Sequence, residues 1–230
     1  MKNAVEKEKD LFPKSLPLLI GGAEVDLVRC PHLLIHSKED LSAVIADLCR
    51  QLTQHTDGRH FRTFLSDPER SVIPNLSREE KNLITGKISE MPHSGQILRW
   101  VLKDIEDRYK KLRDARARDI LTFNRQKEQE WVDHLCSTIH PEYLGDLSVI
   151  MDKTSGLQKK MHRRIVVIAN LETALSAESD SLEKIQRIVE IGRTAGVHVI
   201  AATTDIKSLS AELTNKFTAQ EILQTRLSGL

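Results

Sequence analysis

Short apolar runs alternate along this chain with longer patterns that are apolar on one side only. Residues 16–22 and 23–28 are strand-like runs that meet at Gly21 and Gly22, a combination that predicts a hairpin. A third strand is predicted at residues 31–36, and a one-sided pattern of helical period follows it. The apolar positions of that helix are Leu41, Val44, Ile45, Leu48, Cys49 and Leu52.

The same alternation continues to the end of the chain. Strands are predicted at residues 59–65, 164–169, 197–202 and 217–223. Helices are predicted at residues 95–113, 127–139, 181–195 and 208–213, whereas residues 141–162 are irregular and are expected to form loops. Strands that alternate with helices, several of them apolar throughout, indicate an α/β fold with a parallel sheet covered on both faces.

Two helix starts carry a polar signature. In the pairs Ser37 with Asp40 and Ser77 with Glu80, a serine precedes a carboxylate by three residues, which is the spacing of a capping box. The first pair predicts that a capped helix follows the strand at residues 31–36 directly. The second pair predicts a short helix after Ser77.

Composition narrows the class of protein. A length of 230 residues favours one α/β domain, expected over residues 11–230, and the charged residues 1–10 are expected to form a solvated leader. A net charge of +1 gives no argument for wholesale attraction to nucleic acids or membranes, and the apolar runs are too short to span a bilayer. Three cysteines are a sparse, odd set that suggests reduced thiols, so a cytoplasmic protein is expected.

Several stretches occur in the same order as in one known family. They are residues 16–21, 31–35, 67–70, 98–101, 107–112, 123–125 and 185–188, and the run Gly192-Arg-Thr-Ala-Gly-Val-His-Val-Ile-Ala-Ala-Thr203. From residue 16 to residue 230 the chain resembles the FtsK/SpoIIIE-type DNA translocases. The resemblance implies a RecA-like three-layer sandwich with a mostly parallel central sheet, and a motor domain that forms hexameric rings around duplex DNA.

The chain departs from the family at the phosphate-binding loop. Where the family has a glycine-rich loop after its first core strand, this chain has Ser37, Lys38, Glu39 and Asp40, and no glycine. Glycines let consecutive N–H groups curl around a phosphate, whereas a capped helix start with two carboxylates opposes an anion. The interpretation is a degenerate phosphate loop, with Lys38 as the weaker alternative of a substitute for the family's lysine.

Two further departures fall on the metal and sensor positions. Ala169 and Asn170 stand where the family has the Asp-Glu pair that anchors Mg²⁺ and orients water, and neither side chain can replace that pair. Thr204 and Asp205 stand where the family has a Gln-Arg sensor of the γ-phosphate. Glu172 is a candidate substitute acid, although a role as a helix-start carboxylate is favoured.

The remaining charged groups favour protein contacts over DNA contacts. The basic stretch 99–125 contains acid-before-base pairs at i, i+4, such as Glu106 with Lys110 and Asp107 with Lys111, which indicate a solvated helix face. The stretch 174–184, which corresponds to a DNA-contacting loop of the family, is mostly acidic.

The predicted helix at 181–195 is the best candidate for an interface. Its apolar side is expected to pack on the sheet through Leu182, Ile185, Ile188, Val189 and Ile191. Arg187 and Arg193 remain as candidate contacts with a partner. His134, Cys136 and His140 match no tight zinc-ligand spacing, so no metal is expected.

Together the sequence favours a catalytically inactive FtsK/SpoIIIE-like pseudo-ATPase that acts through protein–protein contacts in a DNA-translocation or secretion assembly. No cofactor is expected, and a monomer or weak oligomer is expected in isolation, with active motor subunits or such an assembly as partners. Two alternatives stay open: a divergent ATP-dependent DNA translocase that uses Lys38, and a nucleotide-independent DNA-binding adaptor. Nucleotide titration and salt-dependent DNA binding separate these hypotheses.

Overall fold

The computed structural model describes residues 15–55, 61–84, 86–88, 94–138, 159–217 and 219–222. The chain divides into two compact units, one made of Met1–Asp107 with His162–Leu230, and one made of Arg108–Met161. The expected leader at residues 1–10 and nearly all of the expected loop at 141–162 lie outside the described residues. The expectation of one domain over residues 11–230 stays a prediction.

The first unit is built on a six-stranded sheet in which every pairing is parallel. In spatial order its strands are β5 (Gly86–Ile88), β4 (Phe61–Ser66), β6 (Arg163–Ile168), β7 (Val197–Thr203), β3 (His32–His36) and β8 (Ala219–Ile222). All seven residues of β7 are buried, as expected for a strand with layers on both faces. The predicted mostly parallel sheet is confirmed.

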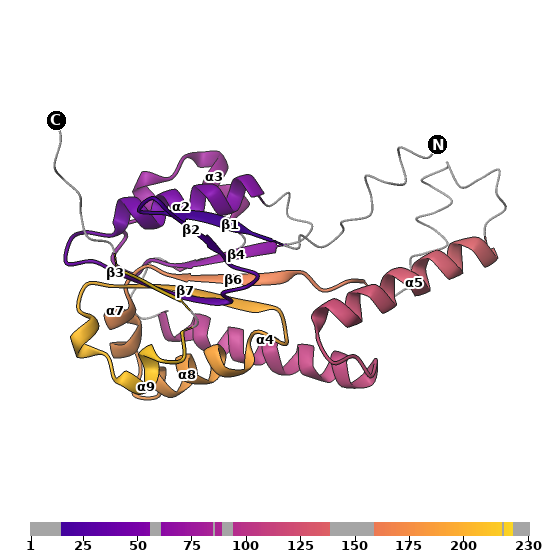
Figure 1. Cartoon of the computed structure of the whole chain (residues 1–230). Helices are drawn as coiled ribbons and strands as arrows, with labels where there is room; N and C mark the ends of the chain where they lie inside the picture. The colour runs from indigo at the N-terminus through magenta and orange to yellow at the C-terminus, as the bar shows by residue number, and fades with distance from the viewer. Residues whose placement is uncertain are drawn as a thin grey trace. The chain divides into compact units, whose positions relative to one another are not determined.

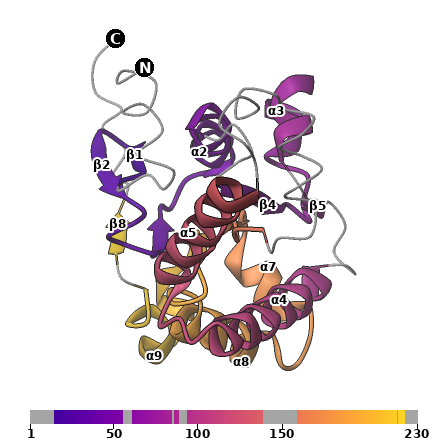
Figure 2. The ribbon, with the colours of Figure 1, turned by 90° about the vertical axis from the view of Figure 1, so that its right-hand side faces the viewer.

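Helices cover both faces of this sheet, as Figure 1 shows. On one face lie α2 (Ser42–His55), η1 (Ile73–Asn75), α3 (Arg78–Leu83) and the hairpin of β1 (Pro17–Ile20) and β2 (Ala23–Asp26). On the other lie α7 (Leu171–Ser176), α8 (Ser181–Ile191), α9 (Ala211–Thr214) and the first part of α4 (Ser94–Asp114), and η4 (Ile206–Ser208) precedes α9. Figure 2 shows the same two layers from the side. The fold is therefore an α/β, RecA-like three-layer sandwich, as predicted.

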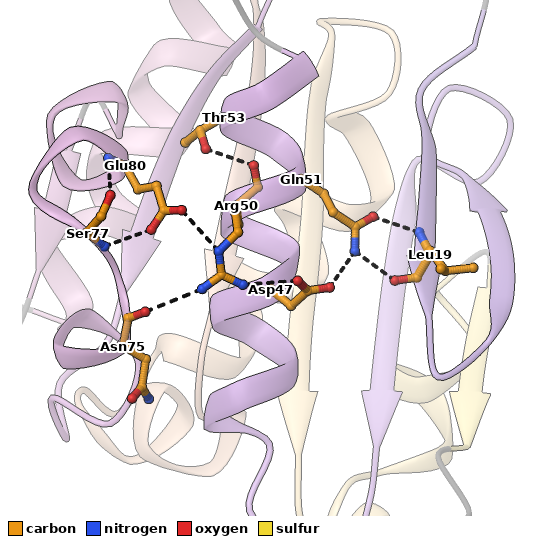
Figure 3. A network of polar contacts seen from close by, with 8 residues as sticks. All are labelled: Leu19, Asp47, Arg50, Gln51, Thr53, Asn75, Ser77 and Glu80. Carbon is orange, nitrogen blue, oxygen red and sulfur yellow. Dashed lines mark hydrogen bonds and ion pairs between the residues drawn. The ribbon is translucent and has the colours of Figure 1, made fainter.

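A polar network holds α2 against its neighbours (Figure 3). The Gln51 amide accepts from the Leu19 N–H at 2.8 Å and donates to the Leu19 carbonyl at 2.9 Å, so it pairs with the edge of β1 as a strand would. On the other side, Arg50 donates to Glu80 at 3.0 Å. Glu80 and Ser77 form the predicted capping box of α3, which is confirmed.

The second unit has a small core of its own. Its helices are the end of α4 and α5 (Ile120–Thr138), and its buried apolar residues are Leu112, Ala117, Ile120, Phe123 and Met161. The amide of buried Asn124 accepts from the Met161 N–H at 2.8 Å and donates to the Met161 carbonyl at 2.9 Å. The Asp119 carboxylate accepts from the Thr122 N–H at 2.7 Å. Because this bond holds the first turn, α5 begins seven residues before the predicted start at 127.

One expectation for the region around α8 is wrong, and one helix was missed. Leu182 does not pack on the sheet, because its side chain is 41% exposed and the fully buried Ser181 takes the inward position of the first turn. Helix α7 lies in a stretch for which no helix was predicted. Ile185, Ile188 and Val189 are buried as predicted.

Two further structural findings concern membrane and metal. None of the helices in the described part of the chain is long and apolar enough to cross a membrane. Among the same residues, no group of three or more His, Cys, Asp or Glu side chains is placed to hold a metal ion. His140, which was considered with His134 and Cys136 as a possible zinc ligand, lies outside the described residues.

Candidate functional site

A pocket of about 90 Å³ lies at the carboxyl ends of the central strands. In parallel α/β sheets this edge is where ligands bind, because loops from several strands converge there. The loops after β3, β4 and β6 and the end of β7 supply its walls. The lining residues are Asp40, Leu41, Ser42, Glu69, Ser71, Ala169, Asn170, Glu172, Ala202, Thr203 and Thr204.

The segment after β3 does not form the predicted capping box. The Ser37 hydroxyl accepts from the Glu39 N–H at 3.0 Å, and the Asp40 carboxylate accepts from the N–H and the hydroxyl of Ser42 at 2.8 and 2.7 Å. Each side chain thus bonds two residues ahead, which makes two local turns. The helix α2 consequently begins at Ser42 and not directly after the strand, so that expectation is wrong.

These turns use groups that a phosphate would need. The N–H groups of Glu39 and Ser42 already donate to side chains, and the exposed Asp40 carboxylate stands at the pocket wall. The pKa of Asp40 is lowered, first by the bond from the Ser42 hydroxyl and then by the Ser42 N–H. Lys38 is exposed and does not line the pocket.

Asn170 acts as a helix cap at the end of β6. Its side-chain oxygen accepts from the Thr173 N–H at 2.8 Å, which makes it the N-cap of α7. Its side-chain nitrogen donates to Glu69 at 2.9 Å, and the Thr173 hydroxyl donates to the same carboxylate oxygen at 2.6 Å. Ala169 contributes only a methyl group to the pocket wall, and its N–H donates to the Ser66 carbonyl.

Glu172 joins the start of α7 to the end of β7. One oxygen of its carboxylate accepts from the Thr203 hydroxyl at 2.5 Å, from the Thr204 N–H at 3.1 Å and from the Asp205 N–H at 3.0 Å. The other oxygen is buried and has no hydrogen-bond partner among the described residues. Glu172 is a helix-start carboxylate, as favoured, and it also accepts from the N–H groups of Thr204 and Asp205, the residues expected at the sensor position.

The pocket wall is therefore acidic. Asp40, Glu69 and Glu172 line it, and no lysine or arginine is among its lining residues. Three carboxylates on the wall of one pocket repel an anion. Chemically, the arrangement favours a cationic or neutral group over a phosphate.

The structure gathers only some of the residues singled out from the sequence. Asp40, Ala169, Asn170 and Thr204 meet in the pocket, whereas Ser37, Lys38, Glu39 and Asp205 do not line it. Glu69 and Ser71 were missed, although they lie a few residues after the strand predicted at 59–65. Position after a strand's carboxyl end was the signal that could have found them.

The interface candidates lie elsewhere. Arg187 is exposed on α8 and pairs with Glu190 at 3.5 Å, and Arg193 is exposed in the turn that follows α8. The acidic loop before α8 is closed by its own ion pairs, since Glu178 binds both Arg99 and Lys184 at 2.5 and 2.6 Å. A side chain at Gly95 would displace the Glu178 side chain from its present position.

Fold and pocket place the chain in the class of RecA-like ATPase-fold domains. The model of the FtsK/SpoIIIE family matches residues 77–213, which is more than half of the chain. The chain belongs to the FtsK/SpoIIIE family.

Individual proteins show the same relationship. The DNA translocase FtsK of Agrobacterium fabrum is 26% identical over 209 residues, which cover 86% of this chain and 23% of that protein. The DNA translocase FtsK of Haemophilus influenzae is 26% identical over 207 residues, which cover 87% of this chain and 38% of that protein. The chain thus spans well under half of the length of these curated relatives.

Solved structures share the fold at lower identity. The pCW3 conjugation coupling protein TcpA, solved in a monomer form with ATPγS, superposes with a TM-score of 0.58 at 16% identity, over 91% of this chain and 55% of TcpA. ATPases 2 and 3 of EssC from Geobacillus thermodenitrificans give a TM-score of 0.59 at 10% identity, over 93% of this chain and 38% of that solved chain. At these identities the likeness shows the fold alone.

Proposed function

We propose that this chain is a catalytically inactive FtsK/SpoIIIE-type module that acts through protein contacts in a DNA-translocation or secretion assembly. The observation that carries the proposal is the pocket wall with Asp40, Glu69 and Glu172 and no lining cation. A nucleotide phosphate there would meet three carboxylates, and Coulomb repulsion in a partly buried site is only weakly screened.

The hydrogen bonds of the pocket support the same conclusion. Binding a phosphate or Mg²⁺ needs free N–H groups, a cation or a free carboxylate. Here Asn170 is engaged as a helix cap, and Glu172 is engaged by Thr203, Thr204 and Asp205. A nucleotide would have to break these bonds before it gained its own. The residues present therefore do not fit ATP with Mg²⁺, and no hydrolytic step is assigned to them.

The relatives supply the context for the assembly. The DNA translocases among them are much longer than this chain, and TcpA was solved with ATPγS. An inactive domain with the same fold could pack beside active motor subunits or regulate them. Arg187 and Arg193 are exposed on and after α8, and we infer that they face such a partner. In isolation the chain is proposed to be a monomer or weak oligomer.

Thermal unfolding with nucleotide tests the loss of binding. Because a ligand that binds only the folded state raises its apparent stability, millimolar Mg·ATP or Mg·ATPγS should leave the melting temperature unchanged. The matching domain of the Haemophilus influenzae translocase serves as the positive control. A saturable rise that Lys38→Ala abolishes would instead support the divergent translocase that uses Lys38.

Light scattering of the isolated chain tests its assembly state. The expected result is a monomer or a weak, concentration-dependent oligomer. A stable hexamer at micromolar concentration without nucleotide would contradict this part of the proposal, because it would show that a ring interface persists without a bridging ligand.

A further inference from the structure

Two basic side chains are buried at the amino end of the central sheet. Arg163 begins β6, His198 is the second residue of β7, and each is only 4% exposed. In the parallel register Arg163 lies beside Phe61, and His198 lies beside Ile165, two residues after Arg163. Because register partners share a face and side chains alternate along a strand, Arg163 and His198 lie on the same face of the sheet. Phe61 and Ile165 belong to the core beneath α2 and the β1–β2 hairpin, so this is the face that those elements cover.

The polar atoms of these two side chains lack hydrogen-bond partners in the part of the chain that the structure describes. They are Nε and Nη1 of Arg163 and both ring nitrogens of His198, and all of them are buried. The Arg163 guanidinium lies 5.9 Å from the centre of the Phe61 ring, which attracts a cation but offers no oxygen to its N–H groups. The Pro31 carbonyl near the imidazole already accepts from the Val199 N–H at 3.3 Å. Because buried donors are almost always paired in folded proteins, the guanidinium and the imidazole point to a ligand that accepts hydrogen bonds.

The protein supplies little negative charge to the buried guanidinium. Burial lowers the pKa of Arg163, and the charge of Asp26 opposes that shift only in part. Among the described residues Asp26 forms no ion pair with Arg163, because its carboxylate is engaged elsewhere. It accepts from the N–H groups of Leu16 at 2.9 Å and Val28 at 3.0 Å, and it pairs with Arg29 at 3.4 Å. A buried cation without a close counter-charge is unfavourable, so the ligand should carry negative charge.

Neighbouring basic groups strengthen this requirement. Burial, and then the charges of Arg163, His32 and Arg193, lower the pKa of His198, so the local potential is positive. A water molecule could accept from the N–H groups, but it is neutral and would leave the charge of the guanidinium uncompensated. An anion both accepts the hydrogen bonds and neutralises the charge. It must be small, because the donor atoms are buried between the sheet and an apolar layer.

We propose that Arg163 and His198 hold a small monovalent anion of the size of chloride at the amino end of the sheet. The guanidinium donates to it through Nε and Nη1, and the imidazole donates through one ring N–H. The anion thereby joins β6 to β7, the two central strands of the sheet. This proposal goes beyond the inactive nucleotide pocket and does not depend on it, because that pocket shares no residue with the anion site.

Thermal unfolding of the whole chain in chloride and in gluconate, at equal ionic strength, tests the proposal. Gluconate is too large to enter a buried site, so it keeps charge screening constant while the chloride concentration is varied. Above its dissociation constant, chloride should raise the folding equilibrium constant about tenfold for each tenfold increase in its concentration. Gluconate should leave that constant unchanged. A chain that showed no chloride effect up to about 150 mM, the physiological ionic strength, would overturn the proposal.

Two matched variants locate the effect. Arg163→Met keeps most of the buried stem and removes the guanidinium, so the response to chloride should be lost. Arg62→Met is the control, since Arg62 is exposed, pairs in register with Arg164 and lies on the opposite face from Arg163. It should keep the chloride response of the parent chain. His198→Phe removes one donor to a charged acceptor, so chloride should bind about tenfold more weakly.

Several results would contradict the anion site. Equal stabilisation by chloride and gluconate would mean that salt acts only by screening. An undiminished chloride response in Arg163→Met would place the bound chloride elsewhere, and stronger stabilisation by formate would assign the site to a carboxylate. If Arg163→Met does not fold, a crystal of the parent chain soaked in bromide decides the question. The anomalous signal of bromide should lie between Arg163 and His198, and a crystal without a peak there would refute the proposal.

Discussion

The two ends of the central sheet differ in how far the hydrogen-bonding groups of their charged and titratable side chains have partners. At the carboxyl end, the carboxylates of Asp67 and Glu172 accept several hydrogen bonds each from backbone and hydroxyl groups. At the amino end, buried nitrogens of Arg163 and His198 have no hydrogen-bond partner among the described residues. The Pro31 carbonyl approaches the His198 ring without the geometry of a hydrogen bond.

This difference separates two sources of sensitivity. The carboxyl end depends on specific bonds, so removing one carboxylate leaves several donors unsatisfied. The amino end depends on the charge state of its histidines, since Arg163 places a positive charge beside His198 and Arg193 does so beside His32. Mutations should therefore disturb the first end, and acid should disturb the second.

The largest effect is expected from Asp67→Ala. Asp67 is fully buried, and its carboxylate accepts from the Val72 N–H at 2.9 Å, the Ile73 N–H at 2.7 Å and the N–H and hydroxyl of Ser71 at 2.9 and 3.2 Å. Its loss orphans these donors, so the free energy of unfolding should fall by about 4 kcal/mol. Urea denaturation measures this. Ser71→Ala, which loses only the longest bond, should cost about 1 kcal/mol, and equal losses in both variants would refute the argument.

Acid should unfold the protein through the amino end. Burial, and then the charge of Arg163, lower the pKa of His198 to about 3 from the ordinary 6.5. The folded histidine stays neutral while the unfolded one takes up a proton, so stability is lost as the pH falls below 6.5 and further down to about 3. At pH 5 the loss from His198 should be about 2 kcal/mol.

The His198 contribution can be isolated with a matched variant. His198→Gln should flatten the dependence of unfolding free energy on pH between 5 and 7 by about 2 kcal/mol, whatever its cost at pH 7. His32, whose pKa is lowered to about 4 by burial and then by Arg193, should give a comparable effect. If the unfolding free energies of the parent and of His198→Gln changed with pH in parallel, protonation of His198 would not be the cause of the loss of stability in acid.

Local signals explain which parts of the fold were predictable. The strands and the Ser77–Glu80 box follow from patterns within a few residues, and the structure has them. The Ser37–Asp40 box has the same spacing but fails, because both side chains bond to closer N–H groups instead. Spacing alone cannot rank two local bonds that compete for one side chain.

The pocket was predictable only in part. Its positions after β3, β6 and β7 came from the resemblance to the family. The bonds of Glu172 to Thr204 and Asp205 join residues more than thirty positions apart, and no local pattern encodes them. The prediction for Leu182 was wrong for a related reason. Helical periodicity identifies the apolar face of a helix, but not where the sheet that covers this face ends.

A moderate effect is expected when Glu172 is removed. In Glu172→Ala the Thr203 hydroxyl and the N–H groups of Thr204 and Asp205 lose their shared acceptor. Because the site is only half-buried and water can replace part of the loss, the cost should be about 1–2 kcal/mol. Glu183→Ala, in the first turn of α8, is the exposed control. If removal of Glu172 raised stability, repulsion between the carboxylates would outweigh the hydrogen bonds of Glu172. The view that such bonds stabilise the carboxyl end of the sheet would then be wrong.

The smallest effect is expected from Asn170→Asp, which places a carboxylate where the resemblance to the family predicts one. The new side chain still caps α7 through its bond from the Thr173 N–H, but it replaces the group that donates to Glu69 at 2.9 Å with an acceptor. Two carboxylates then face each other at a partly exposed site, so stability near pH 7 should fall by about 1 kcal/mol. The loss should shrink toward pH 4, because protonating one acid restores a donor between the pair. Asn170→Ser, which keeps a cap without the second charge, should show no such recovery in acid. Urea midpoints at the two pH values measure both variants, and a loss that did not depend on pH would place the cost in the cap and not in the charge.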